Sequence, residues 1–233
     1  FTIACPSESD TSGSPIYSIQ RSDVSAYSST LVSAEIGKCT TWINKGAFSA
    51  FTNLNTVTLT DSLETIGNKA FQSCTSLTRV DFPSSLKKIK GQAFSGSKLL
   101  SLYVPNNVEE IGGILNTSDN YGYTFAYTPL VTAKIGDGVK QIVEYCFRNC
   151  RSLRTVEIGK NLTRIQTYAF AGCSGLTSIT LHSTVVPTLE SNALDDTNNC
   201  PIYVLDSLVN SYKADSNWSS FASRIHGISE KTS

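Results

Sequence analysis

Residues 63–85 read LETIGNKAFQSCTSLTRVDFPSS, and the order of their apolar residues decides the fold. The same order returns in residues 139–161 and again in residues 162–184, so each copy is 23 residues long. One copy is too short to enclose a core of its own, whereas stacked copies bury their apolar residues jointly. The repeat therefore predicts a solenoid in which each copy forms one coil.

Each copy is expected to contain one short strand. Residues 79–82 (Arg-Val-Asp-Phe) alternate polar and apolar side chains, as in a strand with one buried face. Pro83 ends this strand because it has no N–H to donate to a sheet. Residues 66–74 are expected to form a short helical turn whose phenylalanine points inward. Successive coils then align these side chains in one interior column: Phe71, Phe94, Phe125, Phe147 and Phe170.

The predicted fold class is α/β, a right-handed leucine-rich repeat solenoid with about eight parallel strand rungs. Short helical turns are expected on the convex side, and a helical cap is expected at the C-terminal end. The expected rungs end at Ile36, Leu59, Phe82, Val104, Ile135, Ile158, Leu181 and Val204.

The chain is divided into three parts on this basis. Residues 1–30 are interpreted as an N-terminal lead-in or cap with one short strand near residues 16–19. Residues 31–204 hold the repeats. Residues 205–233 are interpreted as the C-terminal cap, because the open end of a solenoid exposes a layer of core. The apolar residues at helical spacing in that cap are Trp218, Phe221, Ala222 and Ile225.

Composition limits the classes of partner. Charged residues make up 16% of the 233 residues, and Lys plus Arg equals Asp plus Glu. Without a basic excess the chain is not expected to bind nucleic acid or an anionic membrane surface. The sequence holds no long apolar run that predicts a transmembrane helix. It begins at Phe1 and contains no Met, so we expect the start codon and any leader to lie outside it.

Seven cysteines are present, and an odd number excludes complete pairing within the chain. Cys74, Cys150 and Cys173 each follow a repeat phenylalanine by three residues, and Cys146 takes the small-residue position held by Ala70. These positions predict buried, reduced thiols that pack as small apolar groups. The alternative is a disulfide or metal site, but neighbouring rungs hold their side chains parallel rather than convergent. At least five free thiols are expected.

Residues 66–83 follow the pattern Ile-x-x-x-Ala-Phe-x-x-Cys-x-x-Leu-x-x-Val-x-Phe-Pro. This pattern resembles the BspA-like, or Treponema pallidum-type, leucine-rich repeat, and the match covers residues 31–204. Residues 200–225 are similar to the usual end of such proteins in gut and oral Bacteroidetes. The resemblance implies an exported, surface-exposed protein that binds host or microbial surface or matrix proteins. It implies neither catalytic residues nor a cofactor.

Two parts of the repeat array are candidate contact sites. One is the outward side of the sheet, and the other is an insertion at residues 112–124. Ile111 and Phe125 are 14 positions apart where the model copy has 5, so nine residues are inserted. Long insertions are commonly functional, and tyrosine supplies contact area at low entropic cost. The candidate binding residues are Arg79, Asp81, Tyr103 and Lys134 from the sheet, and Asn116, Asp119, Asn120, Tyr121 and Tyr123 from the insertion.

The function predicted from these residues is protein–protein binding or adhesion at the cell surface. The alternatives are a glycan-binding module that uses the same tyrosines for stacking, a passive spacer within a longer surface protein, and a simply solvated sheet face. An enzyme is not expected, because His182 and His226 are the only histidines and no nucleophile elbow, P-loop or metalloprotease motif is present. No metal ligand set is predicted.

Overall fold

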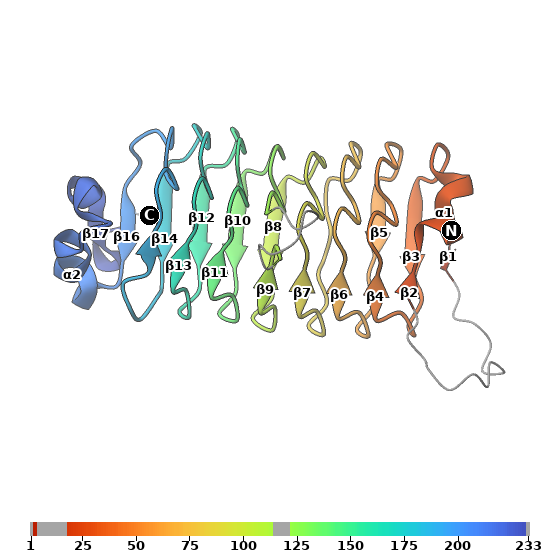
Figure 1. Cartoon of the computed structure of the whole chain (residues 1–233), viewed down its shortest axis with the longest axis horizontal. Helices are drawn as coiled ribbons and strands as arrows, with labels where there is room; N and C mark the ends of the chain where they lie inside the picture. The colour runs from red at the N-terminus through yellow and green to blue at the C-terminus, as the bar shows by residue number, and fades with distance from the viewer. Residues whose placement is uncertain (1, 4–17, 114–121, 232–233) are drawn as a thin grey trace.

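A computed structural model describes residues 2–3, 18–113 and 122–231 of the chain. The coils follow one another along a single axis, with a main sheet on one side (Figure 1). A three-stranded part of this sheet contains β1 (Thr2–Ile3), β3 (Ser33–Ile36) and β5 (Thr56–Thr58). A six-stranded part contains β8 (Ser101–Val104), β10 (Thr132–Ile135), β12 (Thr155–Ile158), β14 (Ser178–Leu181), β16 (Ile202–Val204) and β17 (Ile225–Gly227).

The strands of the main sheet pair in parallel and in repeat register. Lys134 faces Tyr103 on one side and Glu157 on the other, and each of these residues holds the same place in its own copy. Side chains along a strand alternate between core and solvent, so the exposed positions form continuous columns along the stack. The predicted solenoid of parallel rungs is thereby confirmed.

The main sheet is interrupted where residues 79–82 were predicted to form a strand. Only one bridge remains there, between Thr56 and Arg79. The rung still closes the core, because Val80 is buried and Phe82 packs edge-on against Phe94 at 5.6 Å between ring centroids. The alternation of buried and exposed side chains is therefore kept, although the regular strand is not.

Two prolines explain the interruption. At Gly136 and Gly159, the residue after the strand donates its N–H to the last strand residue of the preceding coil, at 2.9 Å in both cases. Pro83 holds the equivalent position after the 79–82 rung, and Pro105 holds it after β8, the next rung. Since neither proline has an N–H, the rung lacks this hydrogen bond to both of its neighbours.

A second ladder of two-residue strands runs along another side of the coils, and the sequence analysis did not predict it. One part contains β2 (Ser18–Ile19), β4 (Trp42–Ile43), β6 (Thr65–Ile66), β7 (Lys88–Ile89) and β9 (Glu110–Ile111). The other contains β11 (Gln141–Ile142), β13 (Arg164–Ile165) and β15 (Thr188–Leu189). Each coil thus contributes to sheets on two sides.

The expected helical turns are hydrogen-bonded turns instead. Residues 68–73 hold two residues in the left-handed region, Lys69 at φ +58° and Ser73 at φ +57°, which a helix does not accommodate. The amide of Phe71 donates to the carbonyl oxygen of Ala93 in the next coil at 2.7 Å. The backbone of this segment therefore hydrogen-bonds between coils rather than along a helix.

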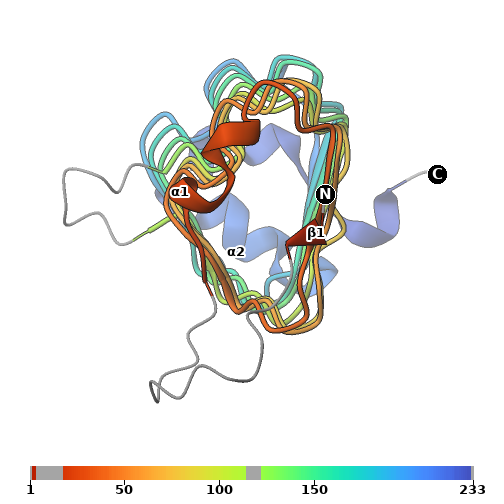
Figure 2. The same cartoon turned by 90° about the vertical axis from the view of Figure 1, so that its right-hand side faces the viewer.

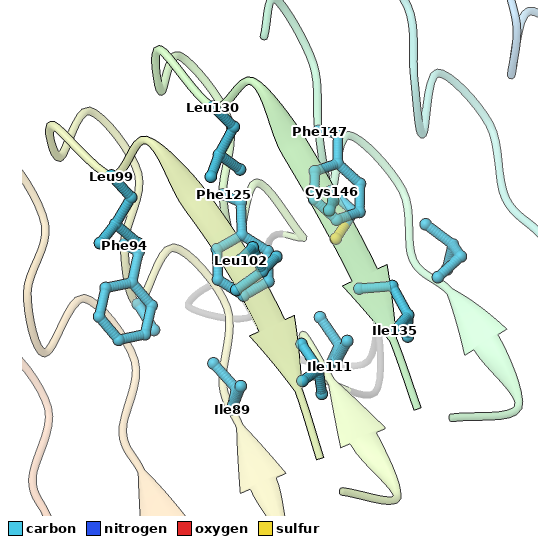
Figure 3. Close-up of a cluster of buried hydrophobic side chains, with 14 of the residues drawn as sticks. Ile89, Phe94, Leu99, Leu102, Ile111, Phe125, Leu130, Ile135, Cys146 and Phe147 are labelled. Carbon is cyan, nitrogen blue, oxygen red and sulfur yellow. The ribbon is translucent and has the colours of Figure 1, made fainter. Parts of the chain in front are cut away.

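The phenylalanine column is confirmed. Its six rings have no solvent exposure and lie parallel to within 17°, with centroids 5.2–5.7 Å apart. Figure 3 shows Phe94, Phe125 and Phe147 in line between the two ladders, with Leu99, Leu130 and Leu102 around them. The column runs through Phe48, Phe71, Phe94, Phe125, Phe147 and Phe170.

Five of the described cysteines are free and buried, as predicted: Cys74, Cys146, Cys150, Cys173 and Cys200. Three of them donate their thiols to the backbone carbonyl of a phenylalanine in the preceding coil, at 3.0–3.2 Å. Cys39 is disulfide-bonded. Each repeat thiol therefore satisfies a carbonyl at the centre of the stack while filling the space of a small apolar side chain.

Burial raises the pKa of the Cys74 thiol from 9.0 to about 12. The unfolded chain releases this proton near pH 9, whereas the folded chain holds it, so Cys74 stabilises the fold less as the pH rises from 9 towards 12. We expect the Cys74→Ala variant to lose about 1.4 kcal/mol less stability than the parent between pH 8 and pH 10. Urea unfolding at both pH values checks this, and equal losses in the two proteins contradict it.

The strand predicted near residues 16–19 is β2, and both ends of the stack hold further elements that the sequence did not predict. At the N-terminal end, α1 (Arg21–Val24) and η1 (Ser25–Tyr27) follow β2, and β1 adds a rung to the main sheet. At the C-terminal end, Ile225 begins strand β17 instead of completing a helical stripe. The C-terminal elements are η2 (Asp206–Leu208), α2 (Val209–Ala214), η3 (Ser219–Arg224), β17 and η4 (Ile228–Glu230). They lie against the last coil (Figure 1).

Candidate functional site

The main-sheet face is the set of outward side chains on β3, β5, residues 79–82, β8, β10, β12, β14 and β16. Four predicted binding residues lie on this face, and the repeat register places them in order along the stack. Tyr103 and Lys134 are direct partners on β8 and β10. Arg79 and Asp81 lie on the interrupted rung before β8.

Arg79 and Asp81 form an exposed ion pair. The Arg79 Nε donates to Asp81 Oδ1 at 3.0 Å, and the two side chains are 75% and 77% exposed. A hollow of about 260 Å³ separates this pair from the outward side of β5. A second hollow of about 290 Å³ lies between the pair and Tyr103. The interrupted rung thus stands between two depressions in the face.

Tyr103 separates the second hollow from a third. Its side chain is 56% exposed, and it lines both the 290 Å³ hollow and a groove of about 420 Å³. The groove continues over Lys134 and Glu157 to Lys231 near the C-terminal end. All four predicted sheet residues therefore line one row of three adjoining hollows.

The groove carries charges of both signs. Lys134 Nζ lies 4.0 Å from one oxygen of Glu157, and Lys231 Nζ lies 3.6 Å from the other. Asp137, on the groove wall, accepts the backbone N–H of Lys160, and this hydrogen bond holds the pKa of its carboxyl below the usual value. The site therefore presents both ammonium and carboxylate groups at neutral pH.

Two exposed apolar residues next to the main sheet were not predicted from the sequence. Leu100 and Val131 are 47% and 39% exposed, and the Val131 N–H donates to the Leu100 carbonyl at 2.8 Å. They hold the position just before β8 and β10, where nearby copies have Asn55, Thr78 or Arg154 and the copy with β3 has the exposed Val32. The change from polar to apolar between residue 78 and residue 100 was the available signal. Leu100 and Val131 thus form an exposed apolar pair at the start of β8 and β10.

The structure separates Tyr123 from the main-sheet face. Its ring stacks on Tyr145 at 4.5 Å, and Tyr145 stacks on Tyr168 at 5.4 Å, in the turn segments that follow β9, β11 and β13. Arg148 lies over Tyr145 and Tyr168 at 5.1 and 5.6 Å from their centroids. Figure 2 looks along the stack and shows the main sheet on one side and the turns on another.

Tyr123 therefore lies among the turns and not beside Tyr103 on the main-sheet face. It holds the same repeat position as Tyr145 and Tyr168, and this shared position explains the stack. The remaining insertion candidates lie outside the described residues: Asn116, Asp119, Asn120 and Tyr121.

Neither a metal-binding cluster nor a membrane-spanning helix is found in the residues that the structure describes. Among them, no group of three or more His, Cys, Asp or Glu side chains is placed to hold a metal ion. None of the helices in this part of the chain has the length and apolar character needed to cross a membrane.

Stacked coils, parallel ladders and a phenylalanine column define a leucine-rich repeat solenoid. The chain belongs to the BspA-type leucine-rich repeat family. The sequence model of that family, described as "BspA type Leucine rich repeat region (6 copies)", matches residues 16–115 and 120–223. The family resemblance inferred from residues 66–83 is thereby confirmed.

Solved structures include similar proteins. A leucine-rich repeat protein from T. pallidum is 28% identical with a TM-score of 0.61, and the match covers 75% of this chain and 77% of that one. A leucine-rich repeat protein from Bacteroides ovatus is 18% identical with a TM-score of 0.48, over 88% of this chain and 63% of that one. No curated protein sequence matches the chain.

Proposed function

We propose that the main-sheet face binds a partner protein, and that the chain performs this binding outside the cell. The observation that carries the proposal is the row of three hollows on one face, with the exposed Tyr103 ring between the second and the third. Tyrosine and arginine are the residues that most often dominate binding energy at protein interfaces, and this face presents both.

The surroundings of Tyr103 also suit a protein partner. The apolar pair Leu100 and Val131 supplies area to bury, and the Arg79–Asp81 and Lys134–Glu157 pairs supply polar groups around it. Protein interfaces combine an apolar centre with a polar rim in this way. The face carries both positive and negative groups. Charge complementarity with the partner therefore determines how the partner is positioned on the face more than how tightly it binds.

An extracellular location is supported by the disulfide at Cys39, because disulfides persist mainly in oxidising compartments. The partner proposed is a surface or matrix protein of a host or of another microbe. The proposal includes adhesion as the biological role and no catalysis.

A substitution at Tyr103 tests the proposal against a matched control. We expect Tyr103→Ala to weaken binding to immobilised extracellular matrix proteins at least tenfold, as loss of a central interface tyrosine costs about 2 kcal/mol or more. Tyr127→Ala removes a ring that is equally exposed, 53% against 56%, but comes from the turn segments. The control is expected to bind like the parent.

Surface plasmon resonance against fibrillar and soluble matrix proteins measures the binding, and thermal unfolding confirms that both variants are folded. Equal binding by the parent and Tyr103→Ala contradicts the proposal. An equal loss in both variants contradicts it too, because the binding then does not depend on the main-sheet face.

A glycan-binding function is the second candidate, because the Tyr103 ring borders hollows on two sides and aromatic rings stack on sugar rings. A glycan array probed with the parent and Tyr103→Ala separates the two functions. Binding to purified glycans that Tyr103→Ala abolishes favours the glycan. If neither glycans nor proteins bind this face, the chain acts as a spacer within a longer surface protein.

A further inference from the structure

The outer face of β14 is covered, whereas those of its neighbours β12 and β16 are partly exposed. Ser178 and Thr180 point outward but are only 9% and 2% exposed, whereas the outward Thr132 and Lys134 of β10 are exposed. Lys231 lies over Thr180, and Ile228 and Lys231 line the groove together with it. Figures 1 and 2 both show the C-terminal end of the chain on the outer side of the main sheet.

Lys231 places its ammonium group against three side chains of the main-sheet face. Its Nζ donates to Thr180 Oγ1 at 3.0 Å and lies 3.6 Å from Glu157 Oε1. It also lies 5.8 Å from the centroid of the Tyr203 ring. Glu157, Thr180 and Tyr203 are register partners on three consecutive strands, β12, β14 and β16. The three groups thus belong to one column of the repeat.

These three groups match the chemistry of a primary ammonium. A carboxylate supplies the opposite charge, a hydroxyl accepts one of the three N–H bonds, and an aromatic ring attracts the cation. Lys134 contacts the other oxygen of Glu157, at 4.0 Å, so Oε1 faces the Lys231 side. The arrangement therefore suits the ammonium group of a lysine side chain.

Another ammonium group can replace that of Lys231 in this arrangement. The Lys231 side chain is still 33% exposed, and ion pairs at such positions are weak and in contact with water. The segment before it is held independently, because the Gly227 N–H donates to Glu230 at 2.8 Å and the Ser229 hydroxyl donates to Asp206 at 2.8 Å. Lys231 can therefore leave its position without unfolding β17.

We propose that Glu157, Thr180 and Tyr203 form a subsite for the ammonium group of a lysine on the partner, and that Lys231 occupies it as an internal ligand. The subsite opens into the same groove as Tyr103 and Lys134. A partner lysine displaces Lys231 when it binds. The inference rests on the proposed function only in assigning the ammonium to a partner protein.

The test uses the full chain and a small probe, so it needs no partner. The probe is Nα-acetyl-lysine N-methylamide, followed by chemical-shift changes at the amides of Glu157, Thr180 and Tyr203 in ¹⁵N-labelled protein. Lys231→Gln empties the subsite, and Lys140→Gln removes an exposed lysine elsewhere as the matched control. The norleucine analogue of the probe lacks the ammonium and serves as the control ligand.

We expect Lys231→Gln to bind the probe about tenfold more tightly than the parent, which corresponds to Lys231 filling the subsite in about nine of ten parent molecules. Lys140→Gln is expected to match the parent, the norleucine analogue to give no shifts, and Lys231→Gln combined with Glu157→Gln to lose binding. The subsite is refuted if Lys231→Gln shows no shifts at these amides, or if the double variant still binds. Equal affinity of the parent and Lys231→Gln refutes the internal ligand. These outcomes do not depend on the matrix-binding experiment, so the subsite can be confirmed or refuted even if the matrix proteins do not bind.

Discussion

Phe147→Ala is expected to lower the free energy of unfolding by about 3–5 kcal/mol, the range for a fully buried aromatic side chain. The ring has no exposure and stacks on Phe125 at 5.5 Å and on Phe170 at 5.2 Å. The substitution therefore opens a cavity in the middle of the column and removes two aromatic contacts together. The neighbouring coils cannot easily close the gap, because β12 of this coil pairs with both β10 and β14 and β11 pairs with β13.

Urea unfolding followed by circular dichroism measures this effect. Phe147→Leu retains most of the apolar volume and is expected to cost less than half as much, whereas the exposed Tyr127→Ala stays within about 0.5 kcal/mol of the parent. Because each coil contacts only its neighbours, Phe147→Ala is also expected to broaden the transition as the two halves uncouple. A loss below 1 kcal/mol contradicts the prediction that the buried Phe147 ring stabilises the stack.

The stacking axis and the core were predictable from the sequence because they depend only on the repeat. Phe71, Phe147 and Phe170 recur at one position of a nearly constant unit, so any packing that buries one of them aligns the others. The same logic placed Tyr103 beside Lys134. Both results follow from register alone and need no knowledge of the loops.

The partners of individual amides were less predictable. A phenylalanine preceded by alanine fits a helical turn in local sequence, yet the Phe71 amide bonds Ala93 in the next coil. The interruption of the main sheet at residues 79–82 could in principle be predicted, since Pro83 follows this rung and Pro105 follows the next one. Its cause emerges only when two copies are aligned, because each proline removes a bond to a different neighbour.

The candidate site residues also differ in how far the repeat predicted their positions. Arg79, Asp81, Tyr103 and Lys134 share the main-sheet face because they occupy strand positions. Tyr123 follows the insertion and returns to a turn position, where it stacks on Tyr145. The cover over Thr180 was not predictable, because no repeat relates residues 228–231 to the strand that they cross.

Trp218→Ala is expected to destabilise the C-terminal end by about 3–5 kcal/mol. The indole is fully buried, its N–H donates to the Pro187 carbonyl at 2.7 Å, and its ring meets Tyr212 edge-on at 5.0 Å. It thereby ties the elements after β16 to residue 187, which lies in the preceding coil. Without this link the last layer of core is exposed at the end of the stack.

Hydrogen exchange distinguishes this effect from general unfolding. Amides of β14 and β16 are expected to lose protection in Trp218→Ala, while those of β3 and β5 at the opposite end keep it, because coupling passes only between neighbouring coils. Trp218→Phe keeps most of the packing but leaves the Pro187 carbonyl without its donor, and about 1–3 kcal/mol is expected. A uniform loss of protection along the stack means that the chain unfolds as one unit. Trp218 then stabilises the whole stack and not its C-terminal end alone.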